Sequence, residues 1–121
     1  MASIFEATAG KLIGPTTGGT VTQATSKATG VTLNTASGQI TLDDAALAAA
    51  AEVTFAVTNS EIAATDVVVV NHSSAGTAGA YLVQANTIAA GSFAITVANL
   101  SGGSLGEAIV VSFVALKGAS S

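Results

Sequence analysis

The feature that most constrains the fold of this chain is an alternation of residue types with a period of two. From Thr20 onward, large apolar residues alternate with Thr, Ala or Asn along short segments, as in "VTFAVT" (53–58) and "FAITVA" (93–98). Successive side chains of a β-strand point to opposite faces, so each segment has one apolar face and one weakly polar face. Threonine is β-branched and carries a hydroxyl, so it suits the solvent face of a strand without adding charge. The alternation therefore predicts half-buried strands.

Turn-forming residues break the chain at short intervals. Asparagine, which tolerates turn geometry, recurs at or near the ends of the alternating segments, and glycine-rich stretches such as "SSAGTAG" and "SGGSLGEA" join others. About eight short strands at this spacing are typical of a sandwich or barrel, and eight is the number in a jelly roll. We therefore predict an all-β, antiparallel, jelly-roll-like sandwich over residues 19–121. The strands are expected near residues 20–24, 30–34, 38–42, 52–58, 66–72, 79–86, 92–98 and 108–116.

Two other segments have a less regular pattern. "LDDAALAAAAE" (42–52) is the helical candidate, because Asp43 or Asp44 can cap a short Ala-rich turn; an irregular loop is the alternative. Its Ala-rich run is far shorter than the roughly 18 apolar residues of a membrane span, so no membrane partner is expected. "TGVTLNTASGQITL" (29–42) has two similar halves, as the arms of a hairpin would have, and we find no internal repeat.

Two predicted strands are apolar on both faces: "DVVVV" (66–70) and "AIVVSFVAL" (108–116). In a two-sheet fold only one face of a strand meets the core. The other face is covered either by an arm or loop of the same chain or by another subunit. The second interpretation predicts a homo-oligomer. The residues predicted for the subunit interface are Val68, Val70, Val110, Val114 and Leu116.

Residues 1–18 do not form a regular element in this interpretation, because Gly10, Gly14 and Pro15 interrupt any pattern. The segment is either a frayed tail or an arm whose apolar residues lodge in a neighbour. Its share of large apolar residues is high for a disordered tail. We therefore predict an extended N-terminal arm. The predicted contact residues of the arm are Ile4, Phe5, Leu12 and Ile13.

The chain is poor in the residues on which catalysis and nucleic-acid binding depend. Charged residues are 8% of the total, against about 25% in an average domain. Three lysines, seven acids and no arginine give a net charge of −4. This composition lacks the basic surface of a nucleic-acid-binding protein. Cysteine is absent, so no disulfide and no thiolate metal site is expected.

One string matches a catalytic motif by letter. "GGSLG" (102–106) fits G-x-S-x-G, but that motif needs a helix after the serine and a histidine downstream. Here a strand is expected after Ser104, and the single histidine, His72, precedes it. Asp43 and Asp44 are adjacent, whereas calcium prefers six to eight oxygens from several nearby acids. We predict no enzymatic activity, no cofactor and no metal.

Three stretches resemble a small β domain of tailed-bacteriophage virions: "GGTVTQATSKATGVTLNTASGQITL", "VTFAVTNSEIAATDVVVVNHSS" and "ITVANLSGGSLGEAIVVSFVALKG". The domain is similar to capsid decoration (cement) proteins and to modules at the ends of phage fibres, and the resemblance covers roughly residues 18–118. It implies a trimer on the outer capsid surface that clamps adjacent capsomers, with the major capsid protein as partner. It assigns no binding residues.

Two functions therefore remain. The first is a structural virion protein that assembles as a homo-oligomer, expected to be a homotrimer, through the outer faces of 66–70 or 108–116 and docks on the shell through the arm. The alternative is a fibre or head-appendage module that binds a host surface glycan or protein through loops 73–79 and 99–107.

Overall fold

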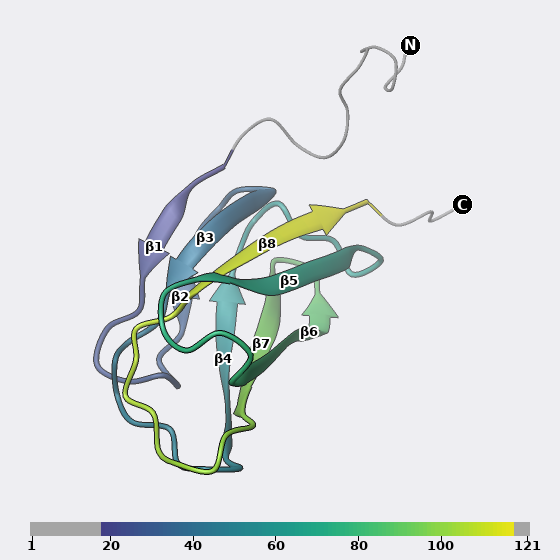
Figure 1. Cartoon of the computed structure of the whole chain (residues 1–121). Coiled ribbons are helices and arrows are strands. Elements are labelled where there is room, and N and C mark those ends of the chain that lie inside the picture. The colour runs from purple at the N-terminus through teal and green to yellow at the C-terminus, as the bar shows by residue number, and fades with distance from the viewer. Residues whose placement is uncertain (1–17, 118–121) are drawn as a thin grey trace.

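The computed structural model describes residues 18–117 (Figure 1). Within this range the chain forms eight β-strands and no helix. The predicted arm residues Ile4, Phe5, Leu12 and Ile13 lie outside the described residues. The strands are β1 (Thr20–Thr22), β2 (Val31–Thr32), β3 (Ser37–Thr41), β4 (Glu52–Thr58), β5 (Val67–Ser74), β6 (Tyr81–Ala89), β7 (Ser92–Asn99) and β8 (Val110–Leu116).

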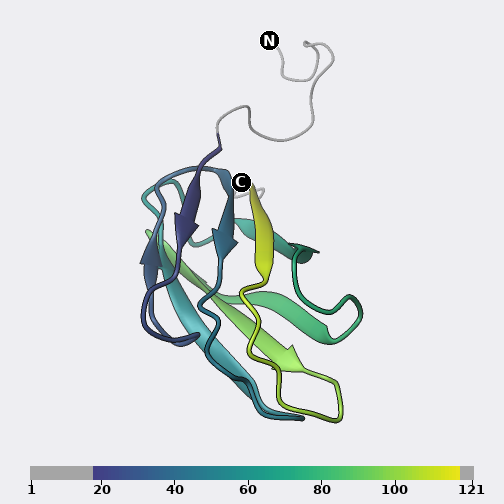
Figure 2. The same ribbon diagram turned by 60° about the vertical axis from the view of Figure 1, so that its left-hand side comes forward.

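The strands form two four-stranded sheets that pack against each other (Figure 2). Sheet A has the order β1-β3-β8-β5, and sheet B has the order β2-β4-β7-β6. The predicted all-β sandwich is therefore confirmed, and every described strand overlaps a predicted one. Successive strands lie in opposite sheets except β6 and β7, which form a hairpin whose turn places Gly91 at φ 84°.

Two pairings differ from the predicted antiparallel arrangement. β1 pairs with β3 in parallel, and β2 pairs with β4 in parallel, so both sheets are mixed. A parallel pair needs a crossover, and here the chain supplies it by passing through the opposite sheet. For the same reason residues 29–42 do not form the predicted hairpin, because β2 and β3 belong to different sheets. The alternation defines the apolar face of each strand but not its partner.

The core lies between the two sheets and is built from the apolar face of each strand. Phe93 of sheet B and Phe113 of sheet A meet across it, with ring centroids 5.3 Å apart. Complete burial of a side chain of this kind contributes about 1.5–3 kcal/mol. The large apolar side chains that are almost completely buried are Ile40, Leu42, Phe55, Val57, Phe93, Ile95, Val97, Ile109 and Val111.

The segment before β4 is the irregular loop that we considered as the alternative to a helix, and the side chain of Lys27 binds it. The buried Lys27 ammonium donates hydrogen bonds to the backbone oxygens of Asp43, Ala45 and Glu107, the last two at 2.8 Å. Burial lowers the pKa of Lys27, and nearby carboxylates, Asp43 first, oppose that shift. One buried cation thus ties loop 42–52 to the loop before β8.

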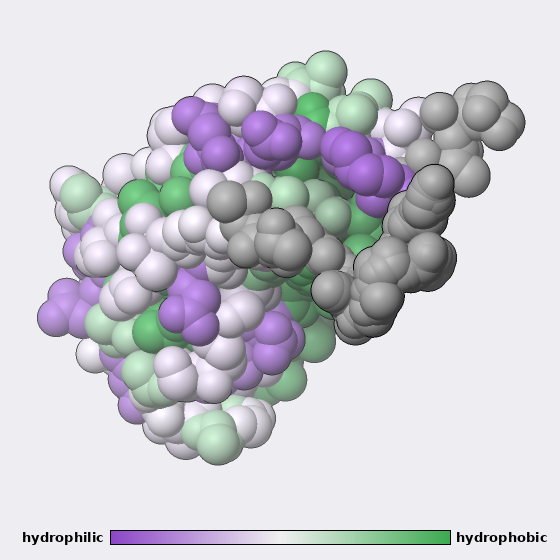
Figure 3. Space-filling model, turned by 90° about the horizontal axis from the view of Figure 1, so that it is seen from above, coloured by the Kyte–Doolittle hydropathy of each residue, from purple (hydrophilic) through white to green (hydrophobic). Residues whose placement is uncertain are grey.

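The face of the molecule seen from above consists mostly of residues of intermediate hydropathy. Near-white and pale-green residues cover much of this face, and strongly hydrophilic residues form a row along one side and smaller groups elsewhere (Figure 3). Because charged residues are only 8% of the chain, copies of this protein repel one another weakly. Charge therefore gives little protection where the surface exposes apolar groups.

Candidate interaction surface

Sheet A brings four aliphatic side chains together on its outer face. β5 and β8 are antiparallel neighbours, and their register pairs Val67 with Leu116 and Val69 with Val114. Directly paired side chains share a face, and the alternate residues of β8 fill the core, so these four face away from it. Val67, Val69 and Leu116 are 55%, 49% and 45% exposed. We call Val67, Val69, Val114 and Leu116 the outer corner.

Three of the five residues predicted for a subunit interface face outward. Val114 and Leu116 belong to the outer corner. Val110 lies on the same face but toward the other end of β8, where it is half-buried and pairs with Thr41 of β3. Ser112 separates Val110 from the outer corner along the strand, so Val110 is not part of it.

The predicted outward placement of Val68 and Val70 is wrong. The register pairs them with buried residues of β8, and both side chains pack against the core. The outward residues of β5 are Val67 and Val69 instead. The string "DVVVV" does not reveal which valines face outward, because all four are apolar. Asn71 could have indicated the outward side of the strand, because it is polar and lies two residues after Val69, on the same face.

β5 is an edge of sheet A, and its valine segment lacks the usual protection of an edge strand. Edge strands are commonly short, bulged or charged, because their free backbone groups invite pairing with another chain. The edge strands β1 and β2 contain only 3 and 2 residues, and β6 is irregular between Asn86 and Ala89. β5 has 8 residues, and its bulge lies beyond the valines, between His72 and Ser74. The outer corner therefore combines exposed apolar side chains with a regular strand edge.

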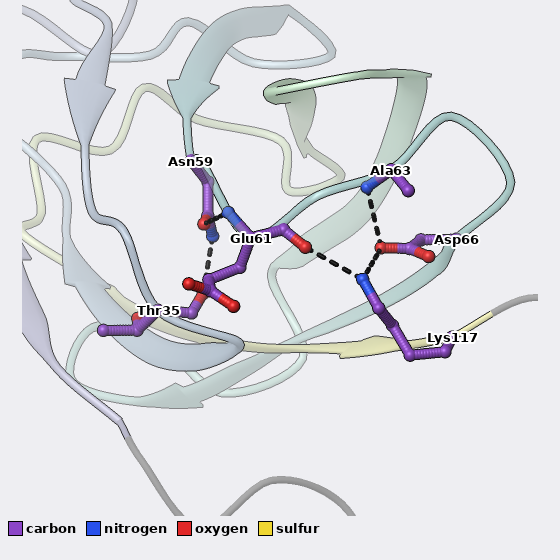
Figure 4. A network of polar contacts seen from close by, with 6 residues as sticks. All are labelled: Thr35, Asn59, Glu61, Ala63, Asp66 and Lys117. Atoms are coloured by element: carbon purple, nitrogen blue, oxygen red, sulfur yellow. Dashed lines mark hydrogen bonds and ion pairs between the residues drawn. The ribbon is translucent and has the colours of Figure 1, made fainter.

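An ion pair fixes the chain beside the outer corner (Figure 4). The Nζ of Lys117 lies 2.8 Å from Oδ2 of Asp66 and donates a second hydrogen bond to the backbone oxygen of Glu61 at 2.9 Å. The same Asp66 oxygen accepts a hydrogen bond from the amide of Ala63 at 2.9 Å. The Asp66 side chain is only 2% exposed, whereas that of Lys117 is 68% exposed. The pair holds the end of β8 to the loop that precedes β5.

Asn59 extends this network to the opposite sheet (Figure 4). Its side chain is completely buried. The Nδ2 of Asn59 donates to the backbone oxygen of Thr35 at 2.6 Å, and its Oδ1 accepts from the amide of Glu61 at 3.0 Å. These hydrogen bonds and the ion pair therefore hold the loops beside the outer corner in a defined conformation.

The outer face of sheet B is small and polar along most of its length. The hydroxyls of Thr54 and Thr96, which are paired on β4 and β7, lie 2.8 Å apart. Asn86 of β6 donates to the Thr96 hydroxyl at 3.0 Å. The large apolar residue exposed on this face is Leu82, at 53%. This face follows the alternation of the sequence, with Thr, Ala, Gln and Asn outward.

The G-x-S-x-G string lies in the connection between β7 and β8. Ser104 is exposed, and the next described element is strand β8 rather than a helix. The buried Asn99 side chain organises this loop by donating to the backbone oxygens of Leu47 and Gly103 at 2.8 and 2.9 Å. Leu105 forms an isolated bridge with Leu47. The local geometry is that of a loop bound to segment 42–52, not of a nucleophile elbow.

A second polar cluster lies toward the other end of β8. The Glu107 carboxylate accepts hydrogen bonds from the Tyr81 hydroxyl at 2.7 Å and from the amide and hydroxyl of Thr77 at 2.9 and 2.8 Å. These bonds, that of Tyr81 first, hold the pKa of Glu107 below its ordinary value. Burial, and then the bond to Glu107, raise the pKa of Tyr81. The cluster fastens the loop before β6 to the loop before β8.

A cavity of about 290 Å³ opens beside this cluster, with His72, Ala75, Gly79 and Tyr81 among the residues around it. The His72 ring packs edge-on against Tyr81 at 5.5 Å, and its Nε2 lies 2.6 Å from the backbone oxygen of Ala75. Across residues 18–117, no three His, Cys, Asp or Glu side chains gather in a way that would hold a metal ion. The described residues also form no helix with the length and apolarity needed to cross a membrane.

Comparison of the chain with protein-family models, with curated proteins and with solved structures gave no match.

Proposed function

We propose that this chain is a structural virion protein that decorates a phage capsid as a homo-oligomer and stabilises it by clamping adjacent capsomers. The observation that supports it most is the outer corner, where Val67 and Val69 of the edge strand β5 and Leu116 of the neighbouring strand β8 are about half exposed. Apolar side chains grouped at an unprotected edge are a surface for contact with another protein chain. The low charge of the chain and its resemblance to decoration proteins fit the same role.

The contact proposed for the outer corner needs no catalytic group and little charge. Aliphatic side chains gain free energy when they leave water, at roughly 25 cal/mol per Å² of buried apolar surface. A strand added along β5 would also satisfy the free backbone groups of that edge. On a capsid, many copies act together, so modest contacts between neighbours and with the major capsid protein become a strong clamp.

The test uses the purified full chain and capsids that lack their decoration. The full chain should bind these capsids and raise the temperature at which they release their contents. The variant Val69→Ser, which makes the outer corner more polar, should bind with clearly lower occupancy. Removal of residues 1–17, which takes away the predicted shell contacts Ile4, Phe5, Leu12 and Ile13, should abolish uptake.

The matched control is Leu82→Ser, which changes an equally exposed apolar residue on sheet B. It should leave capsid uptake unchanged. Failure of the full chain to bind any undecorated capsid of a phage that encodes it would overturn the proposal. Equal loss of uptake in the control and the corner variant would show that the outer corner has no special part in it.

The cavity beside His72 and Tyr81 favours a second candidate, a fibre or head-appendage module that binds a host surface glycan or protein. It lies in the predicted binding loop 73–79, whose surface is rich in Ser, Ala and Gly. Under this function the full chain should bind host cells, and His72→Ala should weaken that binding. Removal of residues 1–17 should leave cell binding intact, whereas it abolishes capsid uptake under the first function.

A further inference from the structure

The cavity beside His72 and the outer corner lie at opposite ends of β5. Val67, in the outer corner, pairs with Leu116 near the end of β8, whereas His72 pairs with Val111 near its start. Val67 and His72 are five positions apart in the strand, a distance of roughly 17 Å. Figure 1 shows the connection from β5 to β6, which carries the cavity, at the end of β5 away from the tip of β8. A copy that is bound through its outer corner therefore keeps this cavity free.

The wall of the cavity is fixed by short-range contacts. Ala75 and Gly76 have φ angles of 64° and 75°, and two successive positive φ angles are the pattern of a type I′ turn. A Cβ added at Gly76 would lie 2.6 Å from the Ile109 side chain, so the turn lies directly against the residue before β8. Nε2 of His72 lies 3.1 and 2.6 Å from the backbone oxygens of Ser74 and Ala75. A ligand in this cavity meets a preorganised wall, which lowers the entropic cost of binding.

A carboxylate lies directly behind this wall. The hydroxyl of Tyr81, which lines the cavity, donates to Glu107 at 2.7 Å, and the amide of Thr77 donates to the same oxygen at 2.9 Å. These bonds, that of Tyr81 first, lower the pKa of Glu107, so its carboxylate is charged at neutral pH. The described residues around the cavity include no lysine or arginine to offset that charge. An anion in the cavity would therefore be repelled.

The side chains around the cavity offer hydrogen bonds in both directions. The hydroxyls of Ser73 and Ser74, both exposed, donate as well as accept. Nε2 of His72 lies beside two carbonyl oxygens and therefore carries a hydrogen, which leaves Nδ1 of the neutral ring as an acceptor. The rings of His72 and Tyr81, edge-on at 5.5 Å, add apolar surface. This combination suits a ligand that carries hydroxyl groups on a carbon skeleton.

The volume of the cavity limits the size of the ligand. About 290 Å³ is at the lower limit for ligand sites, which are roughly 300–1,000 Å³. The cavity therefore admits one small unit rather than several units in a row.

We infer that this cavity binds a small uncharged ligand with several hydroxyl groups, such as one neutral sugar unit, and discriminates against anionic sugars. The inference rests on the second candidate function and names its ligand. The affinity of one site is expected to be weak, with a dissociation constant in the millimolar range, because a single unit makes few contacts. Many copies side by side on one virion would raise the overall affinity by avidity.

The test follows the backbone amide signals of the isotope-labelled full chain by NMR while a sugar is added. The probes are the methyl glycosides of glucose, galactose and mannose. Each is paired with the methyl glycoside of its uronic acid, which differs from it by a carboxylate. We expect at least one neutral probe to shift signals within residues 72–81 and to bind at least about tenfold more tightly than its uronic acid.

Two alanine substitutions separate binding in the cavity from binding elsewhere. Ala78→Leu fills part of the cavity without removing a hydrogen-bonding side chain, so it should abolish the shifts. The matched control is Ala90→Leu, which changes an exposed alanine in the turn between β6 and β7 and should bind the sugar as the unmodified chain does.

Three results would overturn the inference: no shift with any neutral probe, equal binding of a sugar and its uronic acid, or shifts that persist in Ala78→Leu. Binding of the full chain to host cells is measured separately, with the neutral sugars as competitors. Cell binding that these sugars do not reduce contradicts the inference and leaves the appendage function standing. Sugar binding in the cavity without cell binding contradicts only the appendage function.

Discussion

The outer faces of the two sheets are built from strands of the same kind, yet they expose different surfaces. On sheet B, Thr54 and Thr96 share a hydrogen bond between hydroxyls, and Asn86 continues it. On sheet A, the corresponding positions near the end of β8 are the aliphatic residues of the outer corner. The polar side chains on the outer face of sheet B therefore form hydrogen bonds with one another, whereas sheet A leaves a group of apolar side chains exposed.

The long edge strands of the two faces differ in the side chains that they turn outward. Each has an irregular register in its second half, between Asn86 and Ala89 in β6 and between His72 and Ser74 in β5. β6 has the polar residues Gln84 and Asn86 on its outer face, whereas the first half of β5 has Val67 and Val69 there. The apolar side chains beside the edge of β5 support the contact that we propose for sheet A.

The largest difference between the two faces is expected when a positive charge is placed on each of them and self-association is measured. In Val69→Lys, the contact would have to bury an ammonium without a partner, at a cost of several kcal/mol. Since 1.4 kcal/mol corresponds to a tenfold change in affinity, self-association should weaken by at least about 100-fold. Sedimentation velocity over a range of concentrations measures this. The matched variant Thr54→Lys on sheet B should associate as the unmodified chain does, and equal weakening in both variants would remove the distinction between the faces.

The second largest effect is expected from loss of the ion pair beside the outer corner, which should change the free energy of unfolding rather than self-association. In Lys117→Met, the buried Asp66 carboxylate loses its cationic partner. We expect the free energy of unfolding to fall by about 1.5 kcal/mol, the low end of the range for hydrogen bonds to charged groups, because the Lys117 side chain is mostly exposed. Urea denaturation measures the change. Glu52→Gln, which removes an exposed charge on sheet B, should stay within about 0.5 kcal/mol. A Lys117→Met variant as stable as the unmodified chain would show that the ion pair does not stabilise the junction between the end of β8 and the loop before β5.

The smallest effect is expected from Glu107, which lies away from both outer faces. Its folded-state pKa is lowered from 4.5, so its bonds contribute stability that is complete above that value and is lost as the pH falls through the folded-state pKa. Between pH 7 and pH 3, the urea midpoint of the unmodified chain should therefore fall further than that of Glu107→Gln. Equal falls would contradict this assignment. Self-association at neutral pH should be the same in both chains.

The sequence predicted much of this fold because strand formation is a local property. In β4 and β7, each apolar residue alternates with Thr or Ala, so both the strand and its inward face could be predicted. The same reasoning failed at β5, where Val68 and Val70 face the core instead of the solvent. The four valines do not themselves mark the outward side, and the polar residue that does, Asn71, lies just beyond them in the strand.

The candidate surface was therefore predictable in its location and in its β8 residues, Val114 and Leu116, but not in its β5 residues. The sequence showed that 66–70 and 108–116 carry more apolar surface than one core can cover. It did not show that Val67 and Leu116 become neighbours, because they are brought together only by strand pairing between distant parts of the chain. Lys27 is a second example, since its burial depends on backbone oxygens from two separate loops.

The amino-acid sequence by itself determined where the strands of this protein lie, which side of most strands is apolar, and how little charge the surface has, because each depends on residues close together in the chain. The tertiary structure decided which strands pair, that β1 lies parallel to β3 and β2 parallel to β4, and that β5 became an exposed edge with Val67 and Val69 outward. The physical reason is that register and edge position are set by contacts between distant segments, and a period of two residues is compatible with several such pairings.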